Sequence, residues 1–315
     1  MARRRAVAVA APWRFPVERV FKLLWSLVIL VSVLLAVLAG VGGFLTYRVV
    51  TVRNDTENVT PASYLLSSYE TVDFTDRQGG VHEGWLLLGL KGAPVVVLCH
   101  GYNSNRSELL SLGTVLRENH FNVYLYNQQG AKALMSYSNL GVRQAYDLLD
   151  AIDFITKHPA VNAHRVGVFG TTTGGYAALV AAERNPMIEV LVVDTIYDDP
   201  DQMFYAQLDR LLGGSGSIFR FLTRLEFHIA TLRTERLRVR QNLTSLGKIP
   251  KLFISGRDTP ILADATESLY NQAPQPKRLL VLEHSQSALA SGTEKTEYEF
   301  QTLTFFLQNL PLRAD

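Results

Sequence analysis

The segment that most constrains the fold is residues 165–178, with the sequence RVGVFGTTTGGYAA. Its apolar first half predicts a buried strand, and the small residues after the glycines predict the first turns of a helix. Gly170 and Gly174 flank a sharp turn with Thr172 at its centre. Because glycine has no Cβ atom, it allows a strand and a helix to approach closely across such a turn. The segment therefore predicts a strand–turn–helix unit of an α/β protein.

Strand-like and helix-like segments alternate through most of the chain after residue 66. An antiparallel pair is predicted first, at residues 71–75 and 84–88. Later strands are predicted at residues 93–100, 122–126, 166–169, 189–194, 251–255 and 279–282, and helices at residues 109–118, 142–157, 263–272 and 296–309. This alternation predicts a mainly parallel sheet with right-handed crossovers and helices on both faces. Residues 67–315 are long enough for one such domain.

Residues 200–245 interrupt the alternation and predict a small helical cap. Apolar residues recur there at three- and four-residue intervals, which predicts an amphipathic helix. They are Ile218, Phe221, Leu222, Leu225, Ile229 and Leu232. Basic residues outnumber acidic ones between positions 220 and 240. These basic residues have two interpretations, contact with anionic lipid or a solvated outer face of the cap.

Residues 23–47 carry no charge and are long enough to cross a hydrocarbon core of about 30 Å. The competing interpretation is a secretory signal peptide, whose apolar region is usually shorter, about 7–15 residues. Six basic residues precede the run and two follow it closely, so the positive-inside rule puts the N-terminus in the cytoplasm. We therefore expect a basic cytoplasmic segment (1–22), one membrane span (23–47), a tether (48–66) and an extracytoplasmic domain held at the cell membrane.

Composition excludes several classes of function. The net charge is +2, which gives no reason to expect nucleic-acid binding. Cys99 is the only cysteine, so the chain forms no internal disulfide. The sequence has no metal-ligand spacing, P-loop or dinucleotide fingerprint, and we expect neither a metal nor a cofactor.

Residues 95–127 resemble bacterial α/β-hydrolases of the serine-aminopeptidase-like and acyl-esterase-like group. The sequence His100-Gly101-Tyr102 after an apolar strand is similar to the family's oxyanion-hole turn. The turn at Thr172 resembles the family's nucleophile elbow, G-x-S-x-G. The resemblance covers about residues 71–310. It implies an α/β-hydrolase fold, an ancestral activity on esters or amides, and an oxyanion hole formed by the backbone N–H groups of Tyr102 and Thr173.

The chain departs from that family at each catalytic position. Thr172 stands where the family has its serine, and the family's acid aligns with Thr259, one place after Asp258. The family's histidine aligns with Ser287, three places after His284. The elbow also forces its central residue towards positive φ, which strains a β-branched side chain. These departures favour lost or much reduced catalysis.

Three functions therefore remain open. The first is a membrane-anchored acyl hydrolase that has lost most of its activity, and the second is a binding or scaffolding protein that holds a small acyl ligand in the former pocket. The third is an active hydrolase with Thr172 as nucleophile, His284 as base and Asp258 or Asp194 as the orienting acid. Asp194 also has a structural interpretation, and His284 has one as an ordinary loop histidine.

Overall fold

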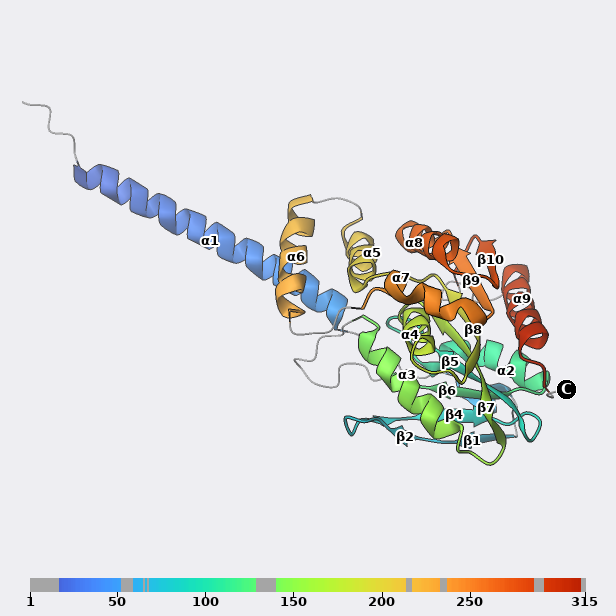
Figure 1. The fold of residues 1–315 in the computed structure, drawn as a ribbon. Helices are drawn as coiled ribbons and strands as arrows, with labels where there is room; N and C mark the ends of the chain where they lie inside the picture. The colour runs from blue at the N-terminus through green and yellow to red at the C-terminus, as the bar shows by residue number, and fades with distance from the viewer. Residues whose placement is uncertain are drawn as a thin grey trace, which may run out of the picture.

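The computed structural model describes residues 17–51, 59–64, 66, 68–128, 140–213, 217–232, 237–285 and 292–312. One long helix, α1 (Val17–Val50), projects away from a layered domain of strands and helices (Figure 1). The three-layer α/β architecture confirms the fold class predicted from the alternating segments. Ser287 lies outside the described residues, and so do four of the six basic residues that precede the apolar run, Arg3, Arg4, Arg5 and Arg14.

The centre of the domain is an eight-stranded sheet with the order β1-β4-β6-β5-β7-β8-β9-β10. Pairing is parallel from β6 to β10, whereas β4 pairs antiparallel with both β1 and β6. The strands are β1 (Tyr69–Thr71), β4 (Gly84–Leu87), β5 (Ala93–Cys99), β6 (Asn122–Tyr126), β7 (Val161–Thr171), β8 (Ile188–Asp194), β9 (Lys251–Gly256) and β10 (Lys277–Leu282). A separate antiparallel ribbon joins β2 (Phe74–Thr75) to β3 (Val81–His82).

Helices cover both faces of the sheet, and the apolar side chains beneath them form two buried clusters. One cluster lies under α2 (Leu110–Glu118) and α9 (Thr293–Asn309). The other lies under α3 (Val142–Ile155), α4 (Thr173–Ala182) and α8 (Pro260–Gln272). The central strands are buried on both faces, which explains their continuous apolar sequences.

Helix α1 extends further than the predicted span. It begins before residue 23 and continues to Val50, three residues into the predicted tether. Val49 and Val50 are fully buried in the same cluster as α3 and α4, whereas most of the earlier part of α1 is exposed. The last turn of α1 is therefore part of the folded domain.

The predicted cap consists of α5 (Pro200–Leu212), α6 (Ser217–Ala230) and α7 (Val239–Asn242), between β8 and β9. Figure 1 shows α6 lying across the last turns of α1, and the hydroxyl of Thr46 donates a hydrogen bond of 3.4 Å to the carbonyl of Thr223. Phe227 of α6 stacks on Phe204 of α5, with ring centroids 4.1 Å apart. The cap thus joins α1 to the domain.

Candidate functional site

The turn between β7 and α4 has the geometry of a nucleophile elbow. Thr172, at its centre, has φ 46° and ψ −110°, a backbone conformation that β-branched residues rarely adopt. A Cβ atom at Gly170 would lie 2.4 Å from the carbonyl oxygen of Gly174. A Cβ atom at Gly174 would lie 2.3 Å from the carbonyl oxygen of Cys99. Both glycines are therefore required for the strand and helix to meet, and the surrounding packing holds Thr172 in its strained conformation.

A second turn, after β5, lies against the elbow and is held by His100. The Nδ1 atom of His100 is 3.0 Å from the carbonyl oxygen of Gly101, and its Nε2 atom accepts a hydrogen bond of 3.0 Å from the N–H of Gln128. The ring is buried. Since both ring nitrogens lie within hydrogen-bond distance of backbone groups, His100 shapes the backbone here and is not placed for proton transfer to a substrate.

The two turns meet at the hydroxyl of Thr172. The backbone N–H of Tyr102 donates a hydrogen bond of 2.9 Å to Thr172 Oγ1. Thr173 is the first residue of α4, so its N–H has no partner within the helix. The Tyr102 donor of the predicted oxyanion hole is therefore already used by the side chain at the nucleophile position. The Thr172 hydroxyl keeps its own proton to donate.

A cavity of about 600 Å³ lies above Thr172. Its lining includes Tyr102, Thr172 and Asp258, which are three of the six candidate site residues named from the sequence. The other residues around it are Gly101, Glu108, Thr195, Met203, Ala206, Gln207, Asp209, Arg210, Thr259, Pro260, Ile261, Leu262 and Ser285. Helix α5 of the cap supplies one wall, and the loop from β9 to α8 supplies another.

The carboxylate of Asp258 is held by Ser285. Asp258 Oδ1 accepts a hydrogen bond of 2.9 Å from the Ser285 N–H, and Oδ2 accepts one of 2.9 Å from the Ser285 hydroxyl. Asp258 thus lies in the cavity, as an orienting acid would, but its partners are the hydroxyl and the backbone amide of Ser285 and not a histidine.

His284 does not line the cavity. Its Nδ1 atom lies 2.8 Å from Glu294 Oε2, and its N–H donates to Glu294 Oε1 at 3.0 Å. The side chain is 54% exposed, and the hydrogen bond with Glu294 raises the pKa of His284. The structure therefore does not bring His284 to Thr172 and Asp258.

Glu108 is a cavity residue that the sequence analysis missed. It follows the oxyanion-hole turn, and its carboxylate forms a short hydrogen bond with the Ser104 hydroxyl. Burial raises the pKa of Glu108, and the negative charge of Asp194 raises it further. The only signal in the sequence was its position soon after His100. Nothing in the pattern indicated that this carboxyl group lies in the cavity.

Asp194 has a structural position at the end of β8. Its Oδ1 atom accepts a hydrogen bond of 2.6 Å from the Thr195 hydroxyl, and its Oδ2 atom accepts one of 3.0 Å from the Tyr298 hydroxyl. It is fully buried. The carboxylate thus links β8 to α9 beneath the cavity.

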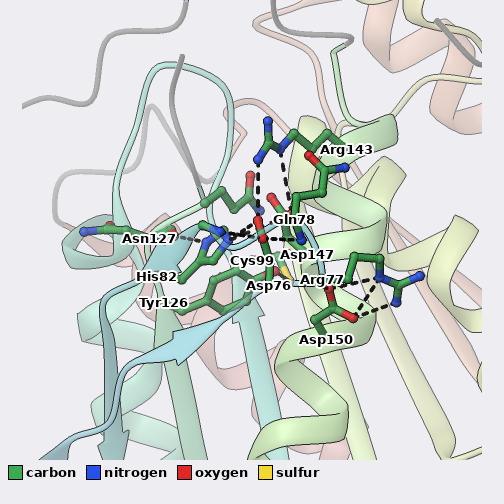
Figure 2. A network of polar contacts seen from close by, with 12 residues as sticks. Asp76, Arg77, Gln78, His82, Cys99, Tyr126, Asn127, Arg143, Asp147 and Asp150 are labelled. Atoms are coloured by element: carbon green, nitrogen blue, oxygen red, sulfur yellow. Dashed lines mark hydrogen bonds and ion pairs between the residues drawn. The ribbon is translucent and has the colours of Figure 1, made fainter. Parts of the chain in front are cut away.

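A second polar network lies away from this cavity, between the β2–β3 ribbon and α3 (Figure 2). His82 Nε2 lies 3.2 Å from Asp76 Oδ2 and 3.9 Å from Asp147 Oδ1. This donor set resembles a metal site, but the Arg143 guanidinium lies 3.4 Å from Asp76 and 4.0 Å from Asp147. The cationic side chain thus occupies the place beside the two carboxylates, and the network fits an ion-pair cluster better than a metal centre.

Comparison with solved structures identifies the architecture. The esterase Pf2001 of Pyrococcus furiosus superposes with a TM-score of 0.66 at 19% identity, over 83% of this chain and 98% of the other. The α/β-hydrolase GrgF of a Penicillium species superposes with a TM-score of 0.57 at 18% identity, over 77% and 99%. The chain has the α/β-hydrolase fold.

Sequence comparison gives further relatives of this α/β-hydrolase-fold chain. No family model matches it. It is 27% identical over 254 residues to the uncharacterized protein YfhR of Escherichia coli K12, covering 77% of this chain and 82% of YfhR. It is also 25% identical over 129 residues to the thiohydrolase aneE of Aspergillus aculeatus, covering 40% of this chain and 41% of the other.

Within this α/β-hydrolase fold, the described cavity lining holds the nucleophile position and an acid but no histidine. A general base must lie within hydrogen-bond reach of the proton that it removes. All seven histidines of the chain lie in described residues, and none of them lines the cavity. Residues 286–291, which lie outside the described residues, contain no histidine. The arrangement can hold a ligand against a hydroxyl, but it has no imidazole to activate Thr172.

Proposed function

We propose that this chain is a membrane-anchored protein of the α/β-hydrolase fold that binds a neutral acyl compound in the inherited cavity and hydrolyses it slowly or not at all. One observation carries the proposal: the Thr172 hydroxyl accepts the Tyr102 N–H in a cavity that no histidine lines. The same hydroxyl retains a proton that it can donate to the carbonyl oxygen of a ligand.

The loss of turnover follows from the chemistry of acyl transfer. A hydroxyl is a weak nucleophile at its free pKa and needs an adjacent base to remove its proton. The three carboxyl groups that line the cavity are poor substitutes, because each already has a partner. Glu108 accepts a hydrogen bond from the Ser104 hydroxyl, and Asp209 pairs with Arg220. Both oxygens of Asp258 accept hydrogen bonds from Ser285. In addition, the Tyr102 N–H cannot stabilise an oxyanion while it donates to Thr172.

The ligand class follows from the cavity lining. Met203, Ala206, Ile261 and Leu262 provide apolar walls suited to a hydrocarbon chain. Asp209 is paired with Arg220, which leaves the acidic residues Glu108 and Asp258 against Arg210 in the described lining. An ester or amide avoids the repulsion that a free carboxylate would meet there.

The membrane anchor in this proposal is α1. The most apolar 18-residue stretch of α1 has a mean hydropathy of 2.7, and it is exposed to the surroundings of the domain. The excess of basic residues before the helix favours a cytoplasmic N-terminus and an extracytoplasmic domain. Protease added to intact cells or spheroplasts should digest the domain, and full protection until lysis would contradict this orientation.

Turnover and binding test the site separately. The purified full chain should show no appreciable hydrolysis of p-nitrophenyl butyrate, and Thr172→Ala should leave any trace unchanged. Robust hydrolysis that Thr172→Ala abolishes would overturn the proposal in favour of an active threonine hydrolase.

Binding is measured as a thermal shift with methyl decanoate and with decanoate. We expect the ester to raise the melting temperature more than the anion does. Thr172→Val, which keeps the branched shape and removes the hydroxyl, should reduce that shift. An equal shift with ester and anion, or one unaffected by Thr172→Val, would contradict the proposed mode of binding.

A further inference from the structure

We infer that α6 lies in the boundary between lipid headgroups and acyl chains, with an apolar stripe on its outer side as the surface that contacts the membrane. The stripe is defined as Phe221, Leu225 and Ile229 of α6 together with Leu232, which lies just after the end of the helix. The inference rests on the proposed anchoring by α1 and adds a second contact with the bilayer. It also orients the whole domain relative to the bilayer, because α6 belongs to the cap over the Thr172 cavity.

The apolar stripe faces outward although α6 is amphipathic. Its four side chains are 66%, 49%, 59% and 76% exposed, in order along the chain. The opposite side of the helix carries Thr223 and Phe227, which are buried against α1 and α5. A helix of a soluble domain buries its apolar stripe in the core. A helix that presents it outward in a contiguous row marks a contact surface for a partner or a membrane.

The helix that carries the stripe packs on α1, and this packing identifies the membrane as the occupant of the stripe. Glu226 of α6 packs so closely on α1 that a Cβ atom at Gly42 would lie 2.9 Å from its carboxylate. One turn further along α1, Thr46 forms its hydrogen bond to Thr223. Figure 1 shows the same crossing of the two helices. The contact fixes α6 at the end of α1, on the side of the domain from which the apolar helix emerges.

The length of α1 places this crossing at the edge of the bilayer. A helix rises about 1.5 Å per residue and needs about 20 residues to cross a hydrocarbon core of about 30 Å. Lys22 is the last charged residue before the apolar run, and counting from Leu23 brings the end of the core to about Gly42. Gly42 is the residue on which Glu226 packs. The helix α6 is therefore held at the depth where interfacial helices bind.

Basic residues beside the stripe also fit a position of α6 at the boundary between lipid headgroups and acyl chains. Arg224 is exposed and lies one turn from Phe221, with its guanidinium 5.8 Å from the centre of the Tyr205 ring. Arg220 is partly exposed and pairs with Asp209 at 2.6 Å. Basic residues that border an apolar face can reach lipid phosphates while the apolar side chains enter the acyl region.

The experiment places an environment-sensitive fluorophore on single cysteines of the full chain. Cys99, the only native cysteine, is fully buried and its pKa is raised to about 12 by burial, so it does not compete for labelling. Leu225→Cys and Ile229→Cys report on the stripe. Val31→Cys reports on α1. Phe300→Cys is the matched control, since Phe300 is a 57% exposed apolar residue of α9.

Each labelled protein is reconstituted in phosphatidylcholine vesicles with and without lipids that carry a nitroxide quencher near the headgroup end of the acyl chain. We expect quenching at positions 225 and 229 to exceed that at position 300 by about twofold or more. Position 31 should be quenched more strongly by a nitroxide near the methyl end of the chain, because it lies at the middle of the span.

The remaining outcomes separate the two proposals. Quenching at position 31 with positions 225 and 229 no different from position 300 would overturn the inference and leave the anchor intact. Absence of quenching at position 31 would overturn the anchor itself. A fluorescence change at positions 225 and 229 that follows protein density and not the quencher would assign the stripe to a second copy of the chain, and would also overturn the inference.

Discussion

The hydroxyl of Tyr102 donates a hydrogen bond of 2.6 Å to the backbone carbonyl of Val49. The N–H of the same residue donates to Thr172 Oγ1. Tyr102 therefore connects the last turn of α1 with the nucleophile position. Burial raises its pKa to about 12, so the hydroxyl stays protonated and remains a donor at physiological pH.

The first prediction concerns this connection. Tyr102→Phe removes one buried hydrogen bond, worth about 1 kcal/mol, and should loosen the last turn of α1. The reporter is the Thr51 N–H, which donates to the Tyr47 carbonyl at 2.9 Å. We expect its hydrogen exchange to accelerate by about fivefold. Tyr69→Phe, on the edge strand β1, is the control. Unchanged exchange in Tyr102→Phe would show that packing of Val49 and Val50 alone holds the helix end.

The second prediction concerns the elbow glycines. Gly174→Ala places a Cβ atom 2.3 Å from a backbone carbonyl, which cannot move without shifting β5. We expect a loss of about 1–3 kcal/mol in the free energy of unfolding, measured by chemical denaturation. Gly247→Ala is the matched control, because its nearest neighbour would be 3.9 Å away on Pro274. Equal stability of the two variants would mean that the elbow is not as tightly packed as its geometry indicates.

The elbow was predictable because its constraint is local. Two glycines four residues apart, with small residues between an apolar strand and a helix, leave few ways to connect the elements, and Thr172 indeed has φ 46°. The alternation of strands and helices was predictable for a similar reason, since a sheet buried on both faces requires continuous apolar strands. In that alternation, Tyr102 and Asp258 each come just after a predicted strand, and both line the cavity.

Other features depend on side-chain contacts that the sequence pattern does not reveal. The direction of His284 is set by Glu294, ten residues later on α9, and Glu108 enters the cavity through the loop that its bond to Ser104 closes. The outward orientation of the α6 stripe depends on the packing of Glu226 against Gly42 of α1. Periodicity identifies an amphipathic helix but does not say which of its sides meets the rest of the molecule.

The third prediction concerns the network in Figure 2. Burial raises the pKa of Asp147 to about 6, against about 3.9 in an unfolded chain. The folded state therefore binds the proton more tightly, and stability falls as pH rises between these two values. Relative to Asp147→Asn, the wild-type free energy of unfolding should decrease by up to about 3 kcal/mol from pH 4 to pH 7.

Asp150 belongs to the same network and is the control, because its pKa is shifted in the opposite direction. Burial acts to raise the pKa of Asp150, but the hydrogen bonds from Arg77 outweigh it and lower the pKa overall. Its contribution to stability is present above the unfolded pKa and is lost as the pH falls through the folded value. Relative to Asp150→Asn, the wild type should therefore lose stability on acidification below about pH 4. Identical pH profiles for the two variants would contradict both assignments.

The last prediction separates a missing nucleophile from a missing base. Thr172→Ser removes the γ-methyl group, relieves part of the strain of a β-branched residue at positive φ, and restores the family's residue at the elbow. A serine needs the same proton acceptor as a threonine, and His284 remains bound to Glu294 outside the cavity. We therefore expect a more stable protein whose turnover of p-nitrophenyl butyrate stays at the background rate.

Glu294→Ala in the Thr172→Ser chain frees His284 and tests whether its loop can turn inward. Appearance of activity only in this double variant would identify the Glu294 contact as the block, whereas activity in Thr172→Ser alone would show that the cavity already contains a functional base.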